Sequence, residues 1–170
     1  MEMNRSLHDF ACSILKSSED AEEVVSDFFI VLWQRRALLR AIENPKLYFF
    51  ISVKNTALTK LAAKKKLAQS PATEWQTSLE SVFFNPEELL LSSEVVKKIM
   101  AAINDLPPKC KIIFKLIKED DLKYAEVAKL LEISVKTVEA QMAIALRRIK
   151  THSEFKNEFP ELHLLLTKNK

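Results

Sequence analysis

The chain of 170 residues contains no glycine, although a protein of average composition has about 7%. Glycine supplies the positive φ angles of the tight turns that join hairpin strands, so its absence disfavours a sheet built from hairpins. It also excludes the Walker and dinucleotide-binding loops, whose backbone must approach a phosphate closely. The chain is therefore predicted to be all-α, with helices that end at Asn, Lys or side-chain caps.

Apolar residues recur at helical spacing in the first part of the chain. The pattern predicts helices over residues 5–17 and 19–34 and a third helix that opens at Pro45. Ser18 is expected to cap the second helix and Asn44 the third, because their side chains can accept hydrogen bonds from unpaired N–H groups of the first turn. The predicted core residues are Leu7, Phe10, Ala11, Ile14, Leu15, Ala21, Val24, Val25, Phe28, Leu32, Leu47, Phe50, Ile51, Leu58 and Leu61.

The middle of the chain interrupts this pattern. Residues 68–93 hold two prolines, four acidic residues and no basic residue, which is typical of a linker. We therefore predict two small helical domains joined by a flexible linker: a domain 1–67, a linker 68–93, a domain 94–153 and a C-terminal tail 154–170. The core residues expected in the first half of the second domain are Val95, Val96, Ile99, Met100, Ile103, Ile112, Ile113, Leu116 and Ile117.

The second domain ends in a predicted helix-turn-helix. Ala128 is small enough for two helices to cross closely, Glu132 occupies a turn position where glycine is common, and Ser134 can cap the second helix. One side of that helix is apolar, with Val135, Val138, Met142, Ala145 and Ile149. The opposite side holds Lys136, Thr137, Ala140, Ile144 and Arg147, with Gln141 and Arg148 at its edge. Such a helix is suited to the major groove of DNA.

Charge is distributed unevenly along the first domain. Acidic residues cluster over residues 19–27, whereas residues 45–67 contain six lysines and no acid. This pattern indicates one surface for a partner protein and another for nucleic acid.

Other classes of protein find little support. The two cysteines and three histidines match no disulfide framework or metal-ligand spacing. No signal peptide is evident, and no apolar stretch approaches the ~20 residues of a membrane span. We expect a cytoplasmic protein without metal, cofactor, catalytic residues or direct membrane insertion.

Three stretches resemble bacterial RNA polymerase sigma factors, most closely the compact extracytoplasmic function (ECF) group of the sigma-70 family. The longest, residues 106–150, resembles the DNA-binding C-terminal domain through LPPKCK, the Tyr124 that precedes EVA, and ISVKTV. The stretch DAEEVVSDFFIVLW (20–33) resembles the polymerase-binding helix, and YFFISVKNTALTKL (48–61) resembles the promoter-melting helix.

The resemblance implies a non-enzymatic factor that binds core RNA polymerase and promoter DNA and directs promoter recognition, melting and initiation. It implies polymerase contacts by Asp20, Glu23, Ser26 and Asp27. Contacts with the minus-ten element are implied for Tyr48, Lys54, Asn55, Lys60, Lys64 and Lys65. Contacts with the minus-thirty-five element are implied for Lys136, Thr137, Ala140, Gln141, Arg147 and Arg148. An anti-sigma factor is a further expected partner, and no small-molecule substrate is expected.

Two alternatives remain open from the sequence. A stand-alone transcriptional regulator could use the same helix-turn-helix without polymerase, and residues 1–67 would then be a sensing or dimerising module. A helical enzyme or adaptor unrelated to DNA is the other. Binding to core polymerase, or to free duplex DNA without it, separates the first alternative from a sigma factor.

Overall fold

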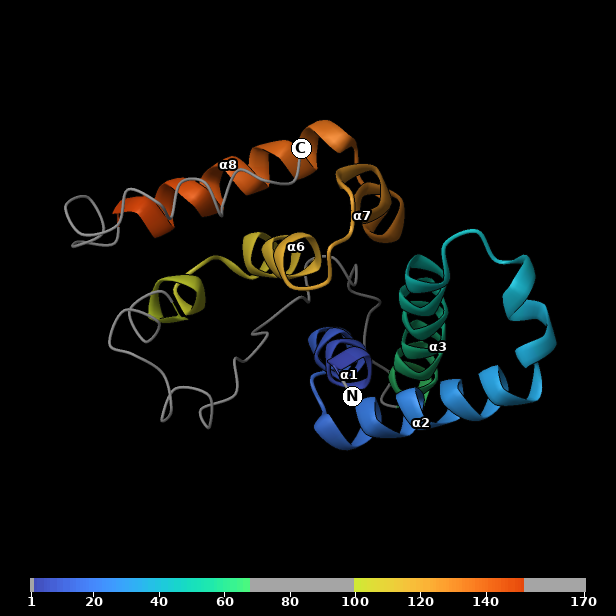
Figure 1. Cartoon of the computed structure of the whole chain (residues 1–170). Helices are drawn as coiled ribbons and strands as arrows, with labels where there is room; N and C mark the ends of the chain where they lie inside the picture. Colours follow the sequence, from blue (N-terminus) through green and yellow to red (C-terminus); the bar gives the residue numbers. More distant parts are fainter. Residues whose placement is uncertain (1, 68–99, 152–170) are drawn as a thin grey trace. The chain divides into compact units, whose positions relative to one another are not determined.

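The computed structural model describes residues 2–67 and 100–151, and helices are the only regular elements in these two ranges (Figure 1). By its internal contacts the chain divides into two compact units, unit 1 (Met1–Val82) and unit 2 (Phe83–Lys170). The predicted all-α fold with a C-terminal helix-turn-helix is confirmed. The linker 68–93 and the tail 154–170 lie outside the described residues, and the predicted domain boundaries stay a prediction.

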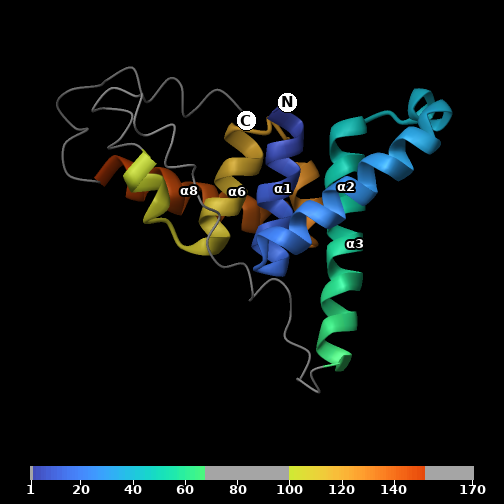
Figure 2. The same ribbon diagram turned by 90° about the horizontal axis from the view of Figure 1, so that it is seen from below.

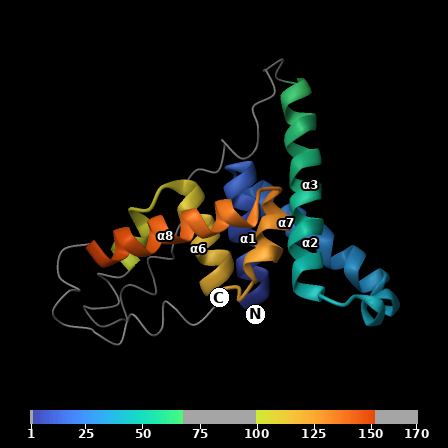
Figure 3. The ribbon, with the colours of Figure 1, turned by 90° about the horizontal axis from the view of Figure 1, so that it is seen from above.

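The described part of unit 1, residues 2–67, contains three α-helices and a short 3-10 helix. These are α1 (Glu2–Leu15), α2 (Ser18–Gln34), η1 (Arg36–Ala41) and α3 (Pro45–Leu67). Helix α1 packs against both α2 and α3, so the core of the unit lies between these helices. Figures 2 and 3 show that the C-terminal end of α3 extends beyond the other two helices of its unit.

The helix ends of unit 1 are built without glycine, as predicted. Lys16 takes a left-handed conformation (φ 58°) between α1 and α2. The N-cap of α2 is Ser17, whose side chain accepts a hydrogen bond from the Asp20 backbone N–H at 3.2 Å; the predicted cap, Ser18, is therefore wrong by one residue. The Asn44 cap is confirmed, since its Oδ1 accepts from the backbone N–H of Leu47 at 3.0 Å.

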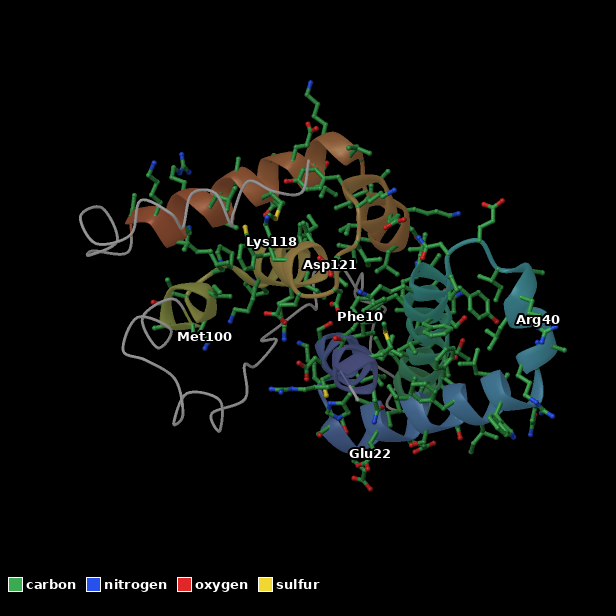
Figure 4. All side chains as sticks on the ribbon, in the orientation of Figure 1. Phe10, Glu22, Arg40, Met100, Lys118 and Asp121 are labelled. Carbon is green, nitrogen blue, oxygen red and sulfur yellow. The ribbon has the colours of Figure 1, made fainter. Side chains whose placement is uncertain are left out.

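The core of unit 1 joins all three α-helices. Phe10 of α1, labelled in Figure 4, meets Phe50 of α3 edge to face, with 5.3 Å between the ring centroids. The predicted core is confirmed for α1 and for α2 as far as Phe28, whereas Leu32 is only half-buried. In α3 the buried set is Phe50, Val53 and Ala57, and the predicted Leu47, Ile51, Leu58 and Leu61 are half-buried.

Unit 2 contains a helical segment at residues 100–104, followed by α6 (Pro108–Lys118), α7 (Tyr124–Leu131) and α8 (Val135–Thr151). Helix α8 packs against α6 and α7 (Figure 3). The predicted core residues Ile103, Ile112, Ile113, Leu116 and Ile117 are buried, and Met100 is half-buried. Val95, Val96 and Ile99 lie outside the described residues.

The corner between α7 and α8 has the geometry of a helix-turn-helix. Glu132 is left-handed (φ 57°, ψ 43°), and the Ile133 N–H donates to the Ala128 carbonyl at 3.0 Å. Ser134 Oγ accepts from the Thr137 N–H at 3.0 Å, which confirms the predicted cap of α8. The start of helix α7 is also held by a side-chain hydrogen bond, in which the Glu126 carboxylate accepts from the Lys123 backbone N–H at 2.8 Å.

The buried side of α8 agrees with its predicted apolar stripe at four of five positions. Val138, Met142, Ala145 and Ile149 are at most 1% exposed, whereas Val135 is 42% exposed. Val135 is the first residue of the helix. We attribute the exposure of Val135 to its place at the N-terminal end of the apolar stripe.

Candidate nucleic-acid interface

Helix α8 presents a polar and basic surface opposite its buried stripe. Lys136, Thr137 and Ala140 are exposed near its beginning, and Arg147 and Arg148 are exposed near its end. The Ser134 cap fixes where this surface begins, and the Thr137 hydroxyl lies 2.8 Å from the Ser134 hydroxyl. Small residues at the beginning and cations at the end are suited to close approach to base edges and to phosphates, respectively.

Gln141 differs from the other predicted contact residues of α8 because it is half-buried and has a partner inside the unit. The thiol of Cys110, near the start of α6, donates to Gln141 Oε1 with 2.8 Å between sulfur and oxygen. Burial raises the pKa of the Cys110 thiol, and the positive charge of Arg148 opposes this to a smaller degree. The thiol therefore keeps its proton at neutral pH and can act as the donor.

The predicted minus-ten residues of α3 occupy different environments. Tyr48 is 39% exposed and Asn55 is exposed, whereas Lys54 is only 4% exposed and lies within unit 1. Lys65 belongs to α3, and the environment of its side chain is not part of what the structure describes. Tyr48 and Asn55 are thus open to a ligand, and Lys54 would need a local rearrangement to reach a phosphate.

Lys60 and Lys64 form ion pairs with acids of α2. The Lys60 ammonium lies 3.2 Å from Asp20 Oδ1 and 2.5 Å from Glu23 Oε2, and Lys64 contacts Asp20 Oδ2. The hydrogen bond from Lys64 is the largest cause of the lowered pKa of Asp20, and it outweighs burial, which acts in the opposite direction. The hydrogen bond to Glu23 is the largest cause of the raised pKa of Lys60. Both lysines are therefore neutralised within unit 1.

The four predicted polymerase contacts of α2 also differ in how exposed they are. Asp20 is buried beneath the two lysines, whereas Glu23, Ser26 and Asp27 are exposed. The pairing of Asp20 across 44 residues with Lys64 has no local sequence signal, because both residue types are ordinary on a helix surface.

An apolar surface on the second half of α2 was missed by the sequence reasoning. Ile30, Val31 and Trp33 are 57%, 44% and 70% exposed, and the Arg36 guanidinium lies 5.0 Å from the centroid of the Trp33 ring. Ile30 and Trp33 are three residues apart and so share one side of α2. Large apolar side chains exposed on one surface are typical of a protein-binding site. The signal was available for Ile30 and Trp33, which lie outside the i, i+3, i+4 stripe that the core uses, whereas Val31 follows the buried Phe28 by three residues.

A cavity of about 210 Å³ lies between α2, η1 and α3. Apolar side chains of Phe28, Val31, Leu32, Leu39 and Ile42 form part of its wall, and polar groups come from Asp27, Arg35, Tyr48, Ser52 and Thr56. The exposed Tyr48 thus lies next to a space with both apolar walls and hydrogen-bonding groups, on the unit that carries the predicted minus-ten residues.

In Figure 4, Glu22 of α2 and Arg40 of η1 point outward from this unit.

Metal-ligating side chains do not gather anywhere in residues 2–67 or 100–151. His8 and Cys12 of α1 are neighbours, with 3.7 Å between Nε2 and Sγ, but no third ligand joins them in the described part of unit 1. None of the described helices is both long enough and apolar enough to cross a bilayer.

Comparison with known proteins gives two family matches. Residues 1–67 match the model of sigma-70 region 2, and residues 97–149 match the model of sigma-70 region 4. The fold resembles the crystal structure of the sigma factor RpoE from Bartonella quintana, solved with the anti-sigma factor NepR. That match has a TM-score of 0.56 and 20% sequence identity, and it covers 88% of this chain and 91% of the other. No curated protein sequence matches the chain.

Proposed function

The chain belongs to the sigma-70 family of RNA polymerase sigma factors, and we propose that its two units hold one promoter at two places while unit 1 binds core polymerase. A member of this family binds core RNA polymerase and promoter DNA and directs transcription initiation. Region 2 and region 4, with residues 68–96 between the matched ranges, are the domain content of the compact ECF group. The proposed domains are residues 1–67 and 94–153, joined by the linker 68–93.

The observation that carries the proposal is the helix-turn-helix of unit 2. Its second helix has a capped start, a buried apolar side and an exposed basic side, and it occurs in a chain whose other unit matches region 2. We propose that α8 enters the major groove of the minus-thirty-five element, with Lys136, Thr137 and Ala140 near bases and Arg147 and Arg148 near phosphates.

Unit 1 is proposed to bind core polymerase through α2 and the minus-ten element through α3. Glu23, Ser26 and Asp27 are accessible for the first contact. Tyr48 and Asn55 are accessible for the second, and the cavity beside Tyr48 offers space for an unpaired base that stacks on the phenol ring.

We propose further that an anti-sigma factor restrains this protein in the cytoplasm. Support comes from the relative that was crystallised with an anti-sigma factor, and from Ile30, Val31 and Trp33 of α2, whose exposure suits a protein partner. No catalytic step is proposed for the chain itself.

The decisive experiment is transcription in vitro by core polymerase of the source organism, with and without this chain, on a library of promoters with randomised upstream elements. We expect initiation that depends on the chain. Asp27→Arg should reduce binding to core polymerase, while Glu43→Arg, the same charge change at an exposed site outside α2, should not. Binding to duplex DNA without any affinity for core polymerase would refute the proposal and support the stand-alone regulator.

A further inference from the structure

The contact between Cys110 and Gln141 joins the start of α6 to the DNA-facing helix α8. It lies within unit 2, where α6 and α8 pack directly on each other. Cys110 is 2% exposed, and Gln141 is half-buried at the edge of the exposed side of α8. One end of the Gln141 carboxamide is therefore held inside the unit, while part of the side chain stays accessible.

The chemistry of the two groups decides which end is inside. A neutral thiol has one S–H donor and only a weak acceptor, whereas a carboxamide has an acceptor oxygen and two N–H donors. Since the Cys110 thiol keeps its proton, its better partner is the Gln141 oxygen, as the structure shows. The exposed end of Gln141 is then the amino group.

The position of Gln141 on α8 gives this orientation a consequence. Gln141 lies one helical turn after Thr137 and two turns before Arg148, so it stands between the proposed base contacts and the proposed phosphate contacts. A free glutamine usually recognises adenine with both ends of its carboxamide, accepting from N6 and donating to N7. An oxygen turned toward α6 is not available for that pair.

We propose that Cys110 is a positioning residue that turns the Gln141 amino group toward DNA, so that this position of α8 prefers guanine to adenine. Guanine offers two acceptors at its major-groove edge, O6 and N7, to the two N–H donors of the amino group, whereas adenine offers N7 alone beside the N6 donor. The inference rests on the proposed function, because it assumes that α8 lies in the major groove of the upstream promoter element.

The test uses the full chain bound to core polymerase and a promoter library whose upstream element is randomised. The base frequencies among initiating promoters are compared for the wild type, Gln141→Ala, Cys110→Ala and Cys110→Ser. The other cysteine provides a matched control, because Cys12 lies in unit 1 and Cys12→Ala should leave the base frequencies unchanged. Thermal unfolding of each variant reports its folding separately.

The wild type should prefer guanine at one position, by about fivefold over adenine, as one additional net hydrogen bond implies. Gln141→Ala should remove the preference at that position alone. Cys110→Ala should move it toward adenine, since the carboxamide is then free to turn. Cys110→Ser should keep the wild-type preference, because the serine hydroxyl can donate to the same oxygen.

Three results would overturn the inference: unchanged base frequencies in Gln141→Ala, equal frequencies in the wild type and a folded Cys110→Ala, or a wild-type preference for adenine at the position that depends on Gln141. Absence of initiation from every member of the library would instead refute the proposed function. The two failures are therefore distinguishable in one experiment.

Discussion

Replacing Asp20 by alanine should make promoter binding more dependent on salt. In the folded chain the two Asp20 oxygens hold Lys60 and Lys64, and Lys60 also contacts Glu23. A lysine that is neutralised within its own domain cannot neutralise a DNA phosphate unless that pair opens. The substitution frees Lys64, whose side chain is 56% exposed, whereas Lys60 keeps Glu23.

The magnitude follows from the number of lysines released. Each cation that newly contacts a phosphate of single-stranded DNA makes the slope of log K against log salt concentration more negative by about 0.7. Asp20→Ala, which frees Lys64, should therefore steepen the slope by about 0.7. The double variant Asp20→Ala/Glu23→Ala also frees Lys60 and should steepen it by about 1.4.

The assay is promoter binding by the assembled holoenzyme, at saturating core polymerase, between about 50 and 200 mM salt. Asp27→Ala is the control, because it removes an exposed acid of the same helix and reports the general effect of a lost negative charge. If Asp20→Ala and Asp27→Ala gave the same slope as the wild type, Lys60 and Lys64 would already contact phosphate in the complex. The ion pairs would then have to open on binding, and the reasoning would be refuted.

Four further predictions concern stability. Phe50→Ala should lower the free energy of unfolding of unit 1 by about 3–5 kcal/mol, because Phe50 is fully buried against Phe10; a loss below about 1 kcal/mol in urea unfolding would contradict this packing. Ser134→Ala should lower the stability of unit 2 by about 1 kcal/mol, and Ser134→Asp, which keeps a capping oxygen, should melt close to the wild type. Glu132→Gly should be more stable than Glu132→Ala by up to about 1 kcal/mol, because the position is left-handed, and the reverse order of melting temperatures would be inconsistent with that turn. The pKa of Asp20 is lower in the folded chain than in the unfolded chain. The contribution of Asp20 to the free energy of unfolding is therefore present above about pH 4 and disappears as the pH falls through the folded pKa. The stabilities of wild type and Asp20→Asn should differ at neutral pH and converge in acid, and a difference that persists in acid would mean that the charge is not its cause.

Local patterns were sufficient to predict much of unit 2. The Ser134 cap and the buried positions Val138, Met142, Ala145 and Ile149 all lie within one helix and its preceding turn, where spacing of three and four residues determines which side chains share a side. The prediction failed at Val135, since periodicity cannot tell how far the neighbouring helix reaches toward the end of a stripe.

Contacts between helices were beyond the sequence reasoning. The lysines of α3 looked like cations for DNA because the run 45–67 contains no acid, yet the acids that neutralise Lys60 and Lys64 come from α2. Gln141 looked like a free contact residue of α8, because its partner Cys110 is 31 residues away in the sequence. Only the packing of α2 on α3 and of α6 on α8 brings these groups together.

Within residues 2–67 and 100–151, three residues are left-handed, Lys16, Asp121 and Glu132, and they have a consequence for the denatured chain. A side chain restricts the backbone freedom of the unfolded ensemble, and a glycine at each of these positions would enlarge that ensemble. Folding therefore loses less conformational entropy at each corner, although each non-glycine residue in this conformation carries an energetic penalty of about 1 kcal/mol in the native state. The two effects oppose each other, so a side chain at these three corners costs less free energy than the left-handed backbone alone implies.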